Sequence, residues 1–361
     1  MTLGRRMGRV LGVATASALS LAVASGCAGR AKTGPGPAAA DRPIGGSGSS
    51  FVIRDLGAPP SMQSVAFAIN SNGYAAGHVF APRSAIGYAA LWSGSSLRTL
   101  HVPLRLRSVA YGINDAGQVV GVGGDSEQAP GRALLWTNGQ ATDLGTLGGR
   151  SGEAESINDA GQVVGSSDLA GGKGFHACAW SNGKVIDLGT LGGTKSGAHG
   201  NNASGKVVGT SYLRRDIGFH AFLWAKGKMT DLGTLGGGNS SGRAVNAVGQ
   251  VVGFSRTPSN KAWHAVLWSA GKIGDLGTLG GRDSWAYGIN DAGLIVGASL
   301  IAGNKTRHAF SWFRGKMPDL GTLGGNMSEA TGVNNRGEIV GASNLPGDRV
   351  RHAFVMTPRG R

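Results

Sequence analysis

Short stretches of alternating residues recur from Phe51 to the end of the chain. In residues 220–224, strand geometry sends His220, Phe222 and Trp224 to one face and the two residues between them to the other. Both faces are then largely apolar. A sheet made of such strands is hydrophobic on both sides, so the pattern predicts sheets packed face to face and no helix.

The alternating stretches belong to a repeat of 44 residues. One Asn returns at this interval seven times, and Gly residues return three and seven positions after it. A Trp keeps the same period in the first six copies, and Met356 takes its place in the seventh. A fixed period of this length is typical of repeat architectures. The Asn residues that mark the copies are Asn70, Asn114, Asn158, Asn202, Asn246, Asn290 and Asn334.

Each copy predicts four short strands joined by tight turns. In the second copy the first two strands are residues 110–114 and 118–121, and in the fourth copy the last two are residues 220–224 and 229–232. The Asn-Asp-Ala-Gly stretch between the first two strands fits a type I turn whose fourth residue has positive φ. Gly is favoured there, and the Asn side chain can bond the local backbone.

The two ends of the chain complement each other. The last copy has three strands and ends before a fourth, whereas residues 51–56 begin as a fourth strand without the preceding three. Joining them would remove the open sheet edges. We therefore predict an all-β fold: a seven-bladed β-propeller of four-stranded blades, closed by the N-terminal strand completing the last blade. An open β-solenoid of seven coils is the alternative.

Composition agrees with this fold and limits the classes of partner. The 66 Gly and 12 Pro among 361 residues are roughly twice the usual share, which disfavours long helices. With 40% hydrophobic residues, most of the chain can bury a core and is not disordered. The net charge of +15 favours acidic partners.

The first 50 residues predict where the protein is located. In residues 1–26 a cationic start precedes an apolar stretch of about 15 residues, which indicates an export signal and is shorter than the roughly 20 needed to span a bilayer. Residues 21–27, Leu-Ala-Val-Ala-Ser-Gly-Cys, resemble a bacterial lipobox, in which Cys27 becomes lipidated. The alternative is cleavage after Ala24 and free secretion. Residues 27–50, rich in Ala, Gly, Pro and Ser, read as a flexible tether, and residues 51–361 as the propeller.

Two motifs point to a known family. His-Ala-Phe or a variant of it begins at five equivalent positions, and Asp-Leu-Gly-Thr-Leu-Gly-Gly recurs five times between residues 143 and 325. With these motifs, residues 51–361 resemble the bacterial extracellular HAF-repeat family. The first two copies differ, with Tyr88 and Arg132 in place of His. The resemblance implies export and repeated β structure, with no established activity or catalytic residue. The five His residues are His176, His220, His264, His308 and His352.

Residues that recur in every copy are expected to serve the scaffold. The His positions are a whole repeat apart, whereas zinc needs three or four converging ligands, so we expect each His to bond a neighbouring loop and predict no metal or cofactor. Glu153 and Glu155 break the period and suit acid-base chemistry, but a solvated surface is the expected reading. His78 and His199 have no visible partner, and Cys178 is expected to be a buried apolar residue. No catalytic constellation is evident.

Binding is expected on the rim that carries the variable loops. Because strands alternate in direction, the loops between second and third strands share one rim with the loops between copies. Aromatic residues interleaved with cations there can stack on sugar rings and attract acidic polymers. The alternative is that these aromatics only pack between blades. The candidate binding residues are Lys173, Tyr212, Arg214, Arg215, Arg256, Lys261, Trp263 and Trp285.

These features together predict a non-catalytic, surface-tethered repeat protein. We expect a monomer that binds protein or acidic glycan in the cell envelope, reaches the membrane through a lipid anchor only, and does not bind nucleic acid. The expected location is the cell surface or outer membrane, with free secretion as the alternative. The alternative function is a propeller-type polysaccharide hydrolase or lyase, which a carboxylate pair converging with a His at the axial mouth would favour.

Overall fold

The computed structural model describes residues 42–43, 51–82, 87–100, 102, 107–124 and 130–359. The export signal, Cys27 and most of the predicted tether lie outside the described residues. All described residues belong to one compact unit, residues 39–361. Within the ranges given above, no helix is both long and apolar enough to cross a membrane.

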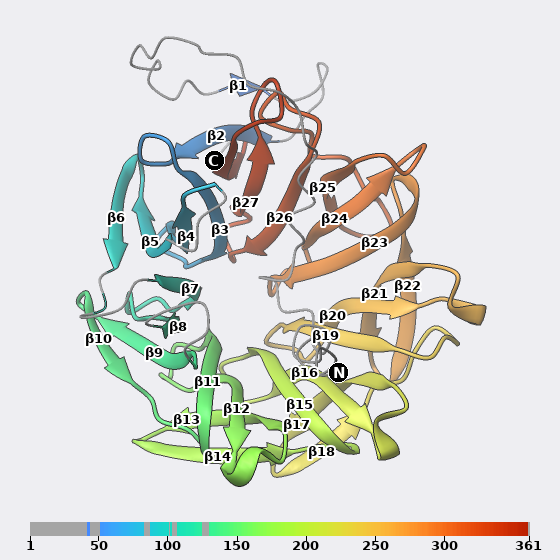
Figure 1. Ribbon diagram of the computed structural model, residues 1–361. Coiled ribbons are helices and arrows are strands. Elements are labelled where there is room, and N and C mark those ends of the chain that lie inside the picture. Colours follow the sequence, from blue (N-terminus) through green and yellow to red (C-terminus); the bar gives the residue numbers. More distant parts are fainter. Residues whose placement is uncertain are drawn as a thin grey trace, which may run out of the picture. The chain divides into compact units, whose positions relative to one another are not determined.

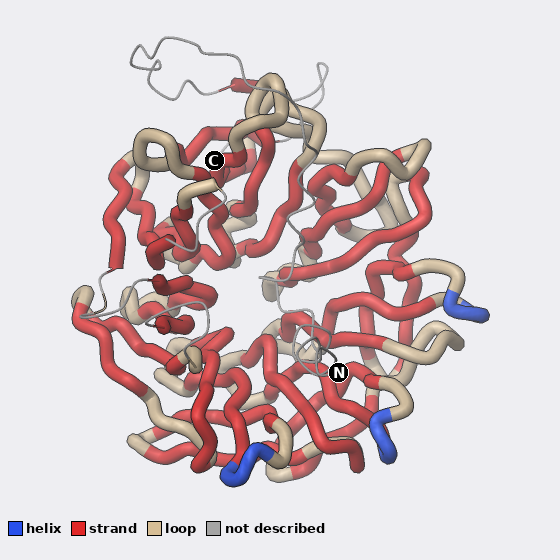
Figure 2. Tube along the Cα trace, viewed as in Figure 1, coloured by secondary structure: helices blue, strands red, loops and turns tan. Residues whose placement is uncertain are grey.

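Strands make up nearly all of the described chain (Figures 1 and 2). In the first two repeats, consecutive strands pair antiparallel, and one parallel pair, Gly87 with Arg107, joins the two repeats. Their strands are β3 (Gln63–Ile69), β4 (Tyr74–Phe80), β5 (Gly87–Ser93), β6 (Ser96–Leu100), β7 (Arg107–Ile113), β8 (Val119–Gly124), β9 (Arg132–Thr137) and β10 (Gln140–Asp143).

The third and fourth repeats have the same antiparallel order and are joined by the pair Phe175 with Lys195. The loop between second and third strands forms a single 3-10 turn in both, which corrects the expectation of no helix. The elements are β11 (Gly148–Ile157), β12 (Val163–Leu169), η2 (Ala170–Gly172), β13 (Phe175–Ser181), β14 (Lys184–Gly189), β15 (Gly192–Asn201), β16 (Val207–Leu213), η3 (Arg214–Asp216), β17 (Phe219–Ala225) and β18 (Lys228–Asp231).

The fifth repeat has four strands and the sixth has three. In the sixth, an isolated bridge between Phe310 and Asp319 stands where a fourth strand is expected. Their elements are β19 (Ser240–Val245), β20 (Val251–Arg256), η4 (Pro258–Asn260), β21 (Trp263–Ser269), β22 (Lys272–Gly277), β23 (Gly280–Ile289), β24 (Ile295–Ile301) and β25 (Arg307–Trp312).

Strands from the two ends of the chain share a sheet. Its order is β1-β2-β28-β27-β26, and β2 pairs antiparallel with β28 from Phe51 opposite Pro358 to Gly57 opposite Ala353. His352 Nδ1 on β28 lies 2.8 Å from a carboxylate oxygen of Asp55 on β2. The bounds are β1 (Arg42–Pro43), β2 (Phe51–Gly57), β26 (Ser328–Val333), β27 (Ile339–Asn344) and β28 (Arg351–Pro358).

The recurring Asn has two roles, of which the sequence predicted one. Its Oδ1 accepts local backbone N–H groups, as in the 2.9 Å bond from Gln118 N to Asn114, and Gly117 in the same turn has φ +76°. Its Nδ2 donates to the backbone carbonyl of the Asn one repeat later, at 2.9–3.3 Å. The seventh, Asn334, donates to Asn70 at 2.9 Å, so the series returns to the first repeat.

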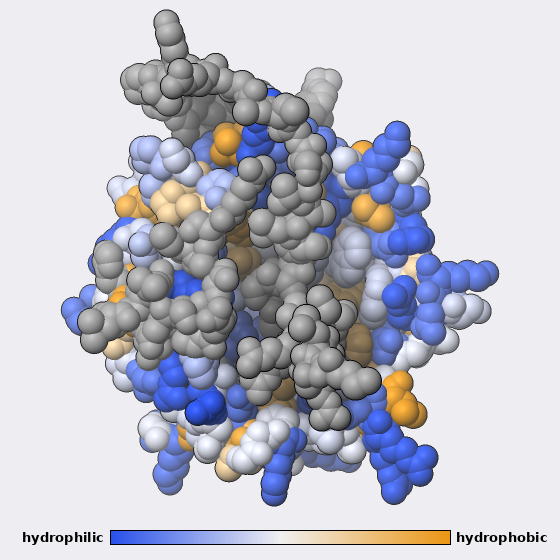
Figure 3. Space-filling model, viewed as in Figure 1, coloured by the Kyte–Doolittle hydropathy of each residue, from blue (hydrophilic) through white to orange (hydrophobic). Residues whose placement is uncertain are grey.

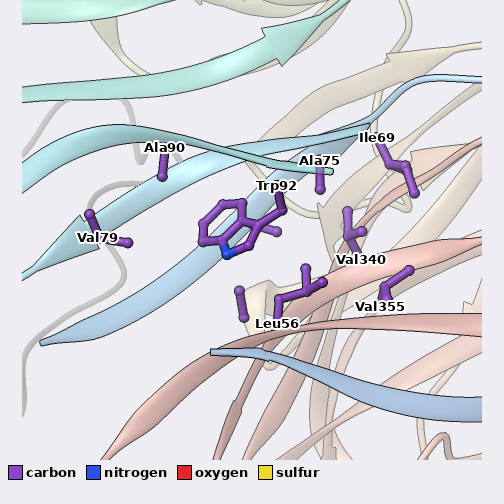
Figure 4. Packing of buried hydrophobic residues seen from close by; sticks show 10 residues of the cluster. Leu56, Ile69, Ala75, Val79, Ala90, Trp92, Val340 and Val355 are labelled. Atoms are coloured by element: carbon purple, nitrogen blue, oxygen red, sulfur yellow. The ribbon is translucent and has the colours of Figure 1, made fainter. Parts of the chain in front are cut away.

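The first strand of each repeat lies toward the centre of the unit (Figure 1). Each contacts the first strands of the repeats before and after it, and β26 contacts β3. The hydrophobic core lies between neighbouring repeats. In the cluster of Figure 4, Ile69 and Trp92 of the first repeat pack with Val340 and Val355 of the last and with Leu56 of β2.

The recurring Trp is not buried equally in all copies. Trp92, Trp136, Trp180 and Trp268 are buried, whereas Trp224 and Trp312 are only partly buried. In those two copies a fully buried Phe, Phe222 or Phe310, stands two residues earlier. Each of these two copies therefore buries the Phe fully, and Trp224 and Trp312 pack against the core from its edge.

The visible described surface is mainly hydrophilic, with separate hydrophobic spots (Figure 3). The most exposed large apolar side chain is Ile217, in the loop after η3, at 81%. Lys173, Arg214, Arg215 and Lys261 lie in or beside the three 3-10 turns.

Candidate functional site

Every first strand contains a β-bulge near its end. Near the end of each first strand the register shifts against the second strand, so that one extra residue stands between the paired positions, and the first strands of the third, fourth and sixth repeats have a second shift near their start. A bulge bends the strand and redirects a side chain. These bulge positions are occupied by Phe67, Tyr111, Glu155, His199, Arg243, Tyr287 and Thr331.

The second recurring Gly of each repeat accommodates the bulge. At Gly209, an added Cβ would overlap the backbone carbonyl oxygen of Gly197 and approach Phe222 to 2.8 Å. The same overlap with a first-strand carbonyl occurs at the six equivalent glycines. The close approach of the two backbones therefore requires Gly, and the residues on each side of the bulge are all Ala, Gly or Ser. The bulge residue itself changes from copy to copy, as does the residue two positions before it.

Glu155 and His199, at the bulges of the third and fourth repeats, form an acidic group together with Glu153. The Nδ1 of His199 lies 2.8 Å from Oε2 of Glu155, and their side chains are only 2% and 12% exposed. His199 Nε2 lies 3.2 Å from Thr210 Oγ1, which lies 2.7 Å from Ser241 Oγ. In the neutral tautomer whose Nδ1–H donates to Glu155, Nε2 accepts from the Thr210 hydroxyl. The arrangement is a carboxylate, an imidazole and a hydroxyl in series.

Glu153 belongs to the same group. Burial raises its pKa to about 7, and the charge of Glu155 adds to the rise, whereas a hydrogen bond with Tyr111 and the charge of Arg107 oppose it. Glu153 is half-buried rather than solvated. The expectation that this acid pair is ordinary solvated surface was therefore wrong, because the bulge at Glu155 directs it toward the neighbouring repeat. The expectation that His199 lacks a partner was wrong for the same reason.

Basic residues gather in the fifth to seventh repeats. Glu329, buried on β26, lies 3.3 Å from Nη2 of Arg307 and also forms an ion pair with Arg351. Burial lowers the pKa of Arg351 to about 10 and also lowers the pKa of Arg243 and of Arg307. Burial raises the pKa of Tyr287, and the charges of the three arginines oppose that rise.

We call these residues together the central cluster. Its acidic half is Glu153, Glu155 and His199, and its basic half is Arg243, Arg307 and Arg351 with Tyr287 and Glu329. The charge of Glu155 supports the protonated form of Arg243, so the halves are electrostatically connected. No group of three His, Cys, Asp or Glu residues suited to a metal ion occurs in the part of the chain that the structure describes.

Sequence reasoning missed most of the central cluster. Arg243, Tyr287, Glu329 and Arg351 were not singled out, although each departs from its repeat, and Arg307 was considered only as a cation of the rim loops. Arg307 and Arg351, for example, stand where earlier copies have Phe175, Phe219 and Trp263. Aligning the copies and marking the positions where they disagree would have found them. What no such alignment supplies is the bulge, which brings the differing side chains together.

The rim residues predicted to bind are brought together only in part. Trp263 stacks on Phe219 at 6.3 Å between ring centroids, Tyr212 contacts Phe219 at 5.7 Å, and the Arg256 guanidinium lies 4.3 Å over Trp263. Trp285 instead lies on β23, paired with Ala298. Lys173, Arg214, Arg215 and Lys261 are spread over three separate loops. The aromatic residues thus pack across neighbouring repeats, and their binding role stays a prediction.

The recurring His residues bond an Asp of their own sheet. In His176, His220, His264, His308 and His352, Nδ1 lies 2.7–2.9 Å from an Asp carboxylate oxygen. Each of these Asp residues also accepts the backbone N–H of a Gly two residues later. Arg132, in place of His, forms an ion pair with Asp143 at 2.7 Å, so the pairing survives the substitution. Cys178 is fully buried, as predicted.

The chain matches no family model and no curated protein. Among solved structures it is similar to the β-propeller domain of the Trilobed protease from Pyrococcus furiosus, with 11% identity and a TM-score of 0.58 over 83% of this chain and 96% of that one. It is also similar to the Pyrococcus horikoshii acylaminoacyl peptidase, with 10% identity and a TM-score of 0.51 over 81% of this chain and 52% of that one. A third similar structure is a Mycobacterium tuberculosis puromycin-hydrolyzing peptidase, with 10% identity and a TM-score of 0.56 over 82% of this chain and 51% of that one.

These likenesses show the fold and correct the expected function. The chain is an all-β protein with a β-propeller fold, and it spans about half the length of the two peptidases. The prediction of a non-catalytic binding module, with a polysaccharide hydrolase or lyase as the alternative, was wrong, because the propellers it is similar to belong to peptidases.

Proposed function

We propose that the chain is a closed, seven-bladed propeller of four-stranded blades. Three observations support this: the seven 44-residue copies, the series of Asn hydrogen bonds that returns from Asn334 to Asn70, and the pairing of β2 with β28. In this arrangement β2 supplies the fourth strand of the last blade. The bulge residues then surround the axis.

We further propose that it is a peptidase-type propeller, which receives a polypeptide substrate at the central cluster for hydrolysis. One observation carries this proposal: side chains that differ between copies, on the first strands and in contact with them, include largely buried groups of both charges, with Glu155 and His199 in one half and Glu329 and its two arginines in the other. Scaffold residues are repeated, so residues that depart from the repeat at one place are candidates for function. The likeness to propellers of peptidases supports a polypeptide as the substrate.

The chemistry of the cluster suits an extended peptide. A peptide presents N–H donors, carbonyl acceptors and charged ends, and the cluster offers carboxylates in one half and guanidinium groups in the other. Charge-assisted hydrogen bonds are stronger than neutral ones, and low exposure strengthens them further. In this proposal a hydrolase domain that lies outside residues 51–361 performs the cleavage.

A second candidate is hydrolysis by this chain itself. The series Glu155, His199 and Thr210 favours it, because a hydroxyl bonded to an imidazole that a carboxylate orients is the arrangement of an activated nucleophile. Thr210 Oγ1 would attack the peptide carbonyl while His199 takes its proton and passes it to the leaving amine. Water would then hydrolyse the ester and restore the hydroxyl.

Binding and cleavage of unstructured peptides by the full chain test both candidates. Calorimetric titration should show binding, and His199→Gln should weaken it about tenfold by removing a partner of Glu155. The matched control is His264→Gln, which alters a His paired with Asp275 in the scaffold. Absence of peptide binding, or equal loss in both variants, would contradict the proposal.

Mass spectrometry of the same mixtures separates the two candidates. If hydrolysis belongs to a partner, the chain alone leaves the peptides intact. If it belongs to this chain, fragments accumulate, and Thr210→Val abolishes them while peptide binding is retained. Fragments that persist in Thr210→Val would exclude the Thr210 mechanism.

We also propose that the protein is exported and anchored by lipid on Cys27, in keeping with its resemblance to the HAF-repeat family. The proposal rests on the sequence of residues 1–50. Intact mass of the mature protein tests it: a diacylglyceryl adduct on a chain beginning at Cys27 supports the anchor, and an unmodified chain beginning at Ser25 contradicts it.

A further inference from the structure

Arg307 and Arg351, in the basic half of the central cluster, have more positive charge than the one carboxylate between them balances. Both guanidinium groups pair with Glu329, and all three side chains are largely buried. Buried charges are normally paired, so this surplus needs an anion.

Both Arg307 and Arg351 also have a hydrogen-bond donor without an acceptor. Among the described residues, the Nε–H groups of Arg307 and Arg351 are buried and have no hydrogen-bond partner. A buried donor left unbonded is costly, and natural structures rarely keep one without a reason. The planar guanidinium matches the geometry of an oxyanion, which it can bond through two N–H groups.

The position of these residues in the repeat argues against a role in the scaffold. Arg307 and Arg351 begin the third strands of the sixth and seventh copies, where the third to fifth copies have Phe or Trp. Those copies form the same strand without an arginine, so the strand does not require one. Glu329 likewise stands where the fifth copy has Ser241. The three substitutions occur together in neighbouring sheets.

We propose that Arg307 and Arg351 bind the terminal carboxylate of a peptide. This inference rests on the proposed function and names the part of the substrate that the basic half recognises. The carboxylate accepts from the free Nε–H groups and neutralises the surplus charge. Glu329 keeps the two arginines in place and excludes a second anion. The acidic half, on the first-strand bulges of the third and fourth copies, is left for the rest of the peptide.

Calorimetric titration of the full chain with one peptide in two forms tests the inference. We expect the form with a free C-terminal carboxylate to bind at least about tenfold more tightly than the same peptide with a C-terminal amide. Arg307→Phe restores the residue of earlier copies and leaves Glu329 paired with Arg351, so it should fold and reduce the preference to about onefold. Arg351→Phe combined with Glu329→Ser should do the same without leaving an unpaired acid.

The control is Arg336→Gln, which removes a positive charge from an exposed turn where Arg336 pairs with Glu338. It should keep the full preference for the free acid. If both forms bind wild type equally, the carboxylate site is wrong although peptide binding stands. If Arg336→Gln loses the preference as strongly as Arg307→Phe, general charge and not this site explains it.

A test without peptide separates this inference from the proposed function. Succinate should raise the melting temperature of wild type and not that of Arg307→Phe. If succinate stabilises in this way while no peptide binds, the carboxylate site stands and the proposed function fails. If inorganic phosphate stabilises wild type more than succinate does, the site selects phosphate and the inference is overturned.

Discussion

At the scale of single residues, burial at the centre changes the acid-base behaviour of the protein. Glu153 has a pKa of about 7 because burial and the charge of Glu155 oppose its ionisation. Its folded pKa lies above the unfolded value, so the folded state holds the proton more tightly than the unfolded state does. Its contribution to stability is greatest below the unfolded pKa and is lost as the pH rises to about 7.

We therefore predict that Glu153→Gln makes the protein more stable than wild type above about pH 7. The expected gain in free energy of unfolding is about 1–3 kcal/mol at about pH 8, shrinking toward about pH 4. Urea denaturation across this range measures it. Burial and the charge of Arg107 lower the pKa of His78 to about 4, so its contribution to stability changes with pH in the opposite direction. Wild type and Glu153→Gln share this residue, so its effect cancels in their difference. A constant difference between them at all pH values would contradict the prediction.

At the scale of the structural element, the bulged first strand depends on a glycine in the second strand. Gly209→Ala places a methyl group against the carbonyl of Gly197 and the ring of Phe222. We predict a loss of at least about 2 kcal/mol in the free energy of unfolding, measured by denaturant titration, because an overfilled contact forces the backbone apart.

Gly274→Ala on β22 is the matched control for this change. Its added Cβ would have only the Leu267 carbonyl nearby, at 3.8 Å, so the free energy of unfolding should change by less than about 1 kcal/mol. Equal losses in the two variants would indicate that alanine in any strand is harmful and that the bulge is not the cause.

The strands themselves were predictable from the sequence, and the bulges were not. Alternation and the Asn-Asp-Ala-Gly turns located β7 and β8 to within a few residues. A bulge interrupts the alternation of faces at one residue, so alternation alone does not show which way the Glu155 side chain is directed. The Asn side chain that reaches the next repeat was missed too, because a local turn already explains the Asn. The recurring Gly seven residues after it was the available signal of a tight contact.

At the scale of the whole molecule, the two ends of the folded unit lie in neighbouring strands. Val52 faces Thr357 in the register of β2 and β28. We predict that Val52→Cys with Thr357→Cys forms a disulfide and raises the free energy of unfolding. In the chain-entropy description, closing this loop of some 300 residues gains about 3–4 kcal/mol more than closing a hairpin of four. Denaturation of the oxidised and reduced forms measures the gain.

A disulfide in a single hairpin is the comparison for that experiment. Ser93 and Ser96 face each other across the turn between β5 and β6, so Ser93→Cys with Ser96→Cys closes a very short loop. Its stabilisation should be clearly smaller. Failure of the Val52 and Thr357 pair to oxidise would mean that the two chain ends do not stay together in solution.

The bulge positions also separate two tasks that most proteins must combine in the same residues. The frame depends on the recurring Asn, Gly and His-Asp pairs, whereas the residue at the bulge differs from copy to copy. Exchanging Glu155, Arg243 or Tyr287 for another side chain should alter what the molecule recognises while its architecture persists. Evolution or engineering can therefore change the binding preference of this protein through single substitutions at the bulge positions.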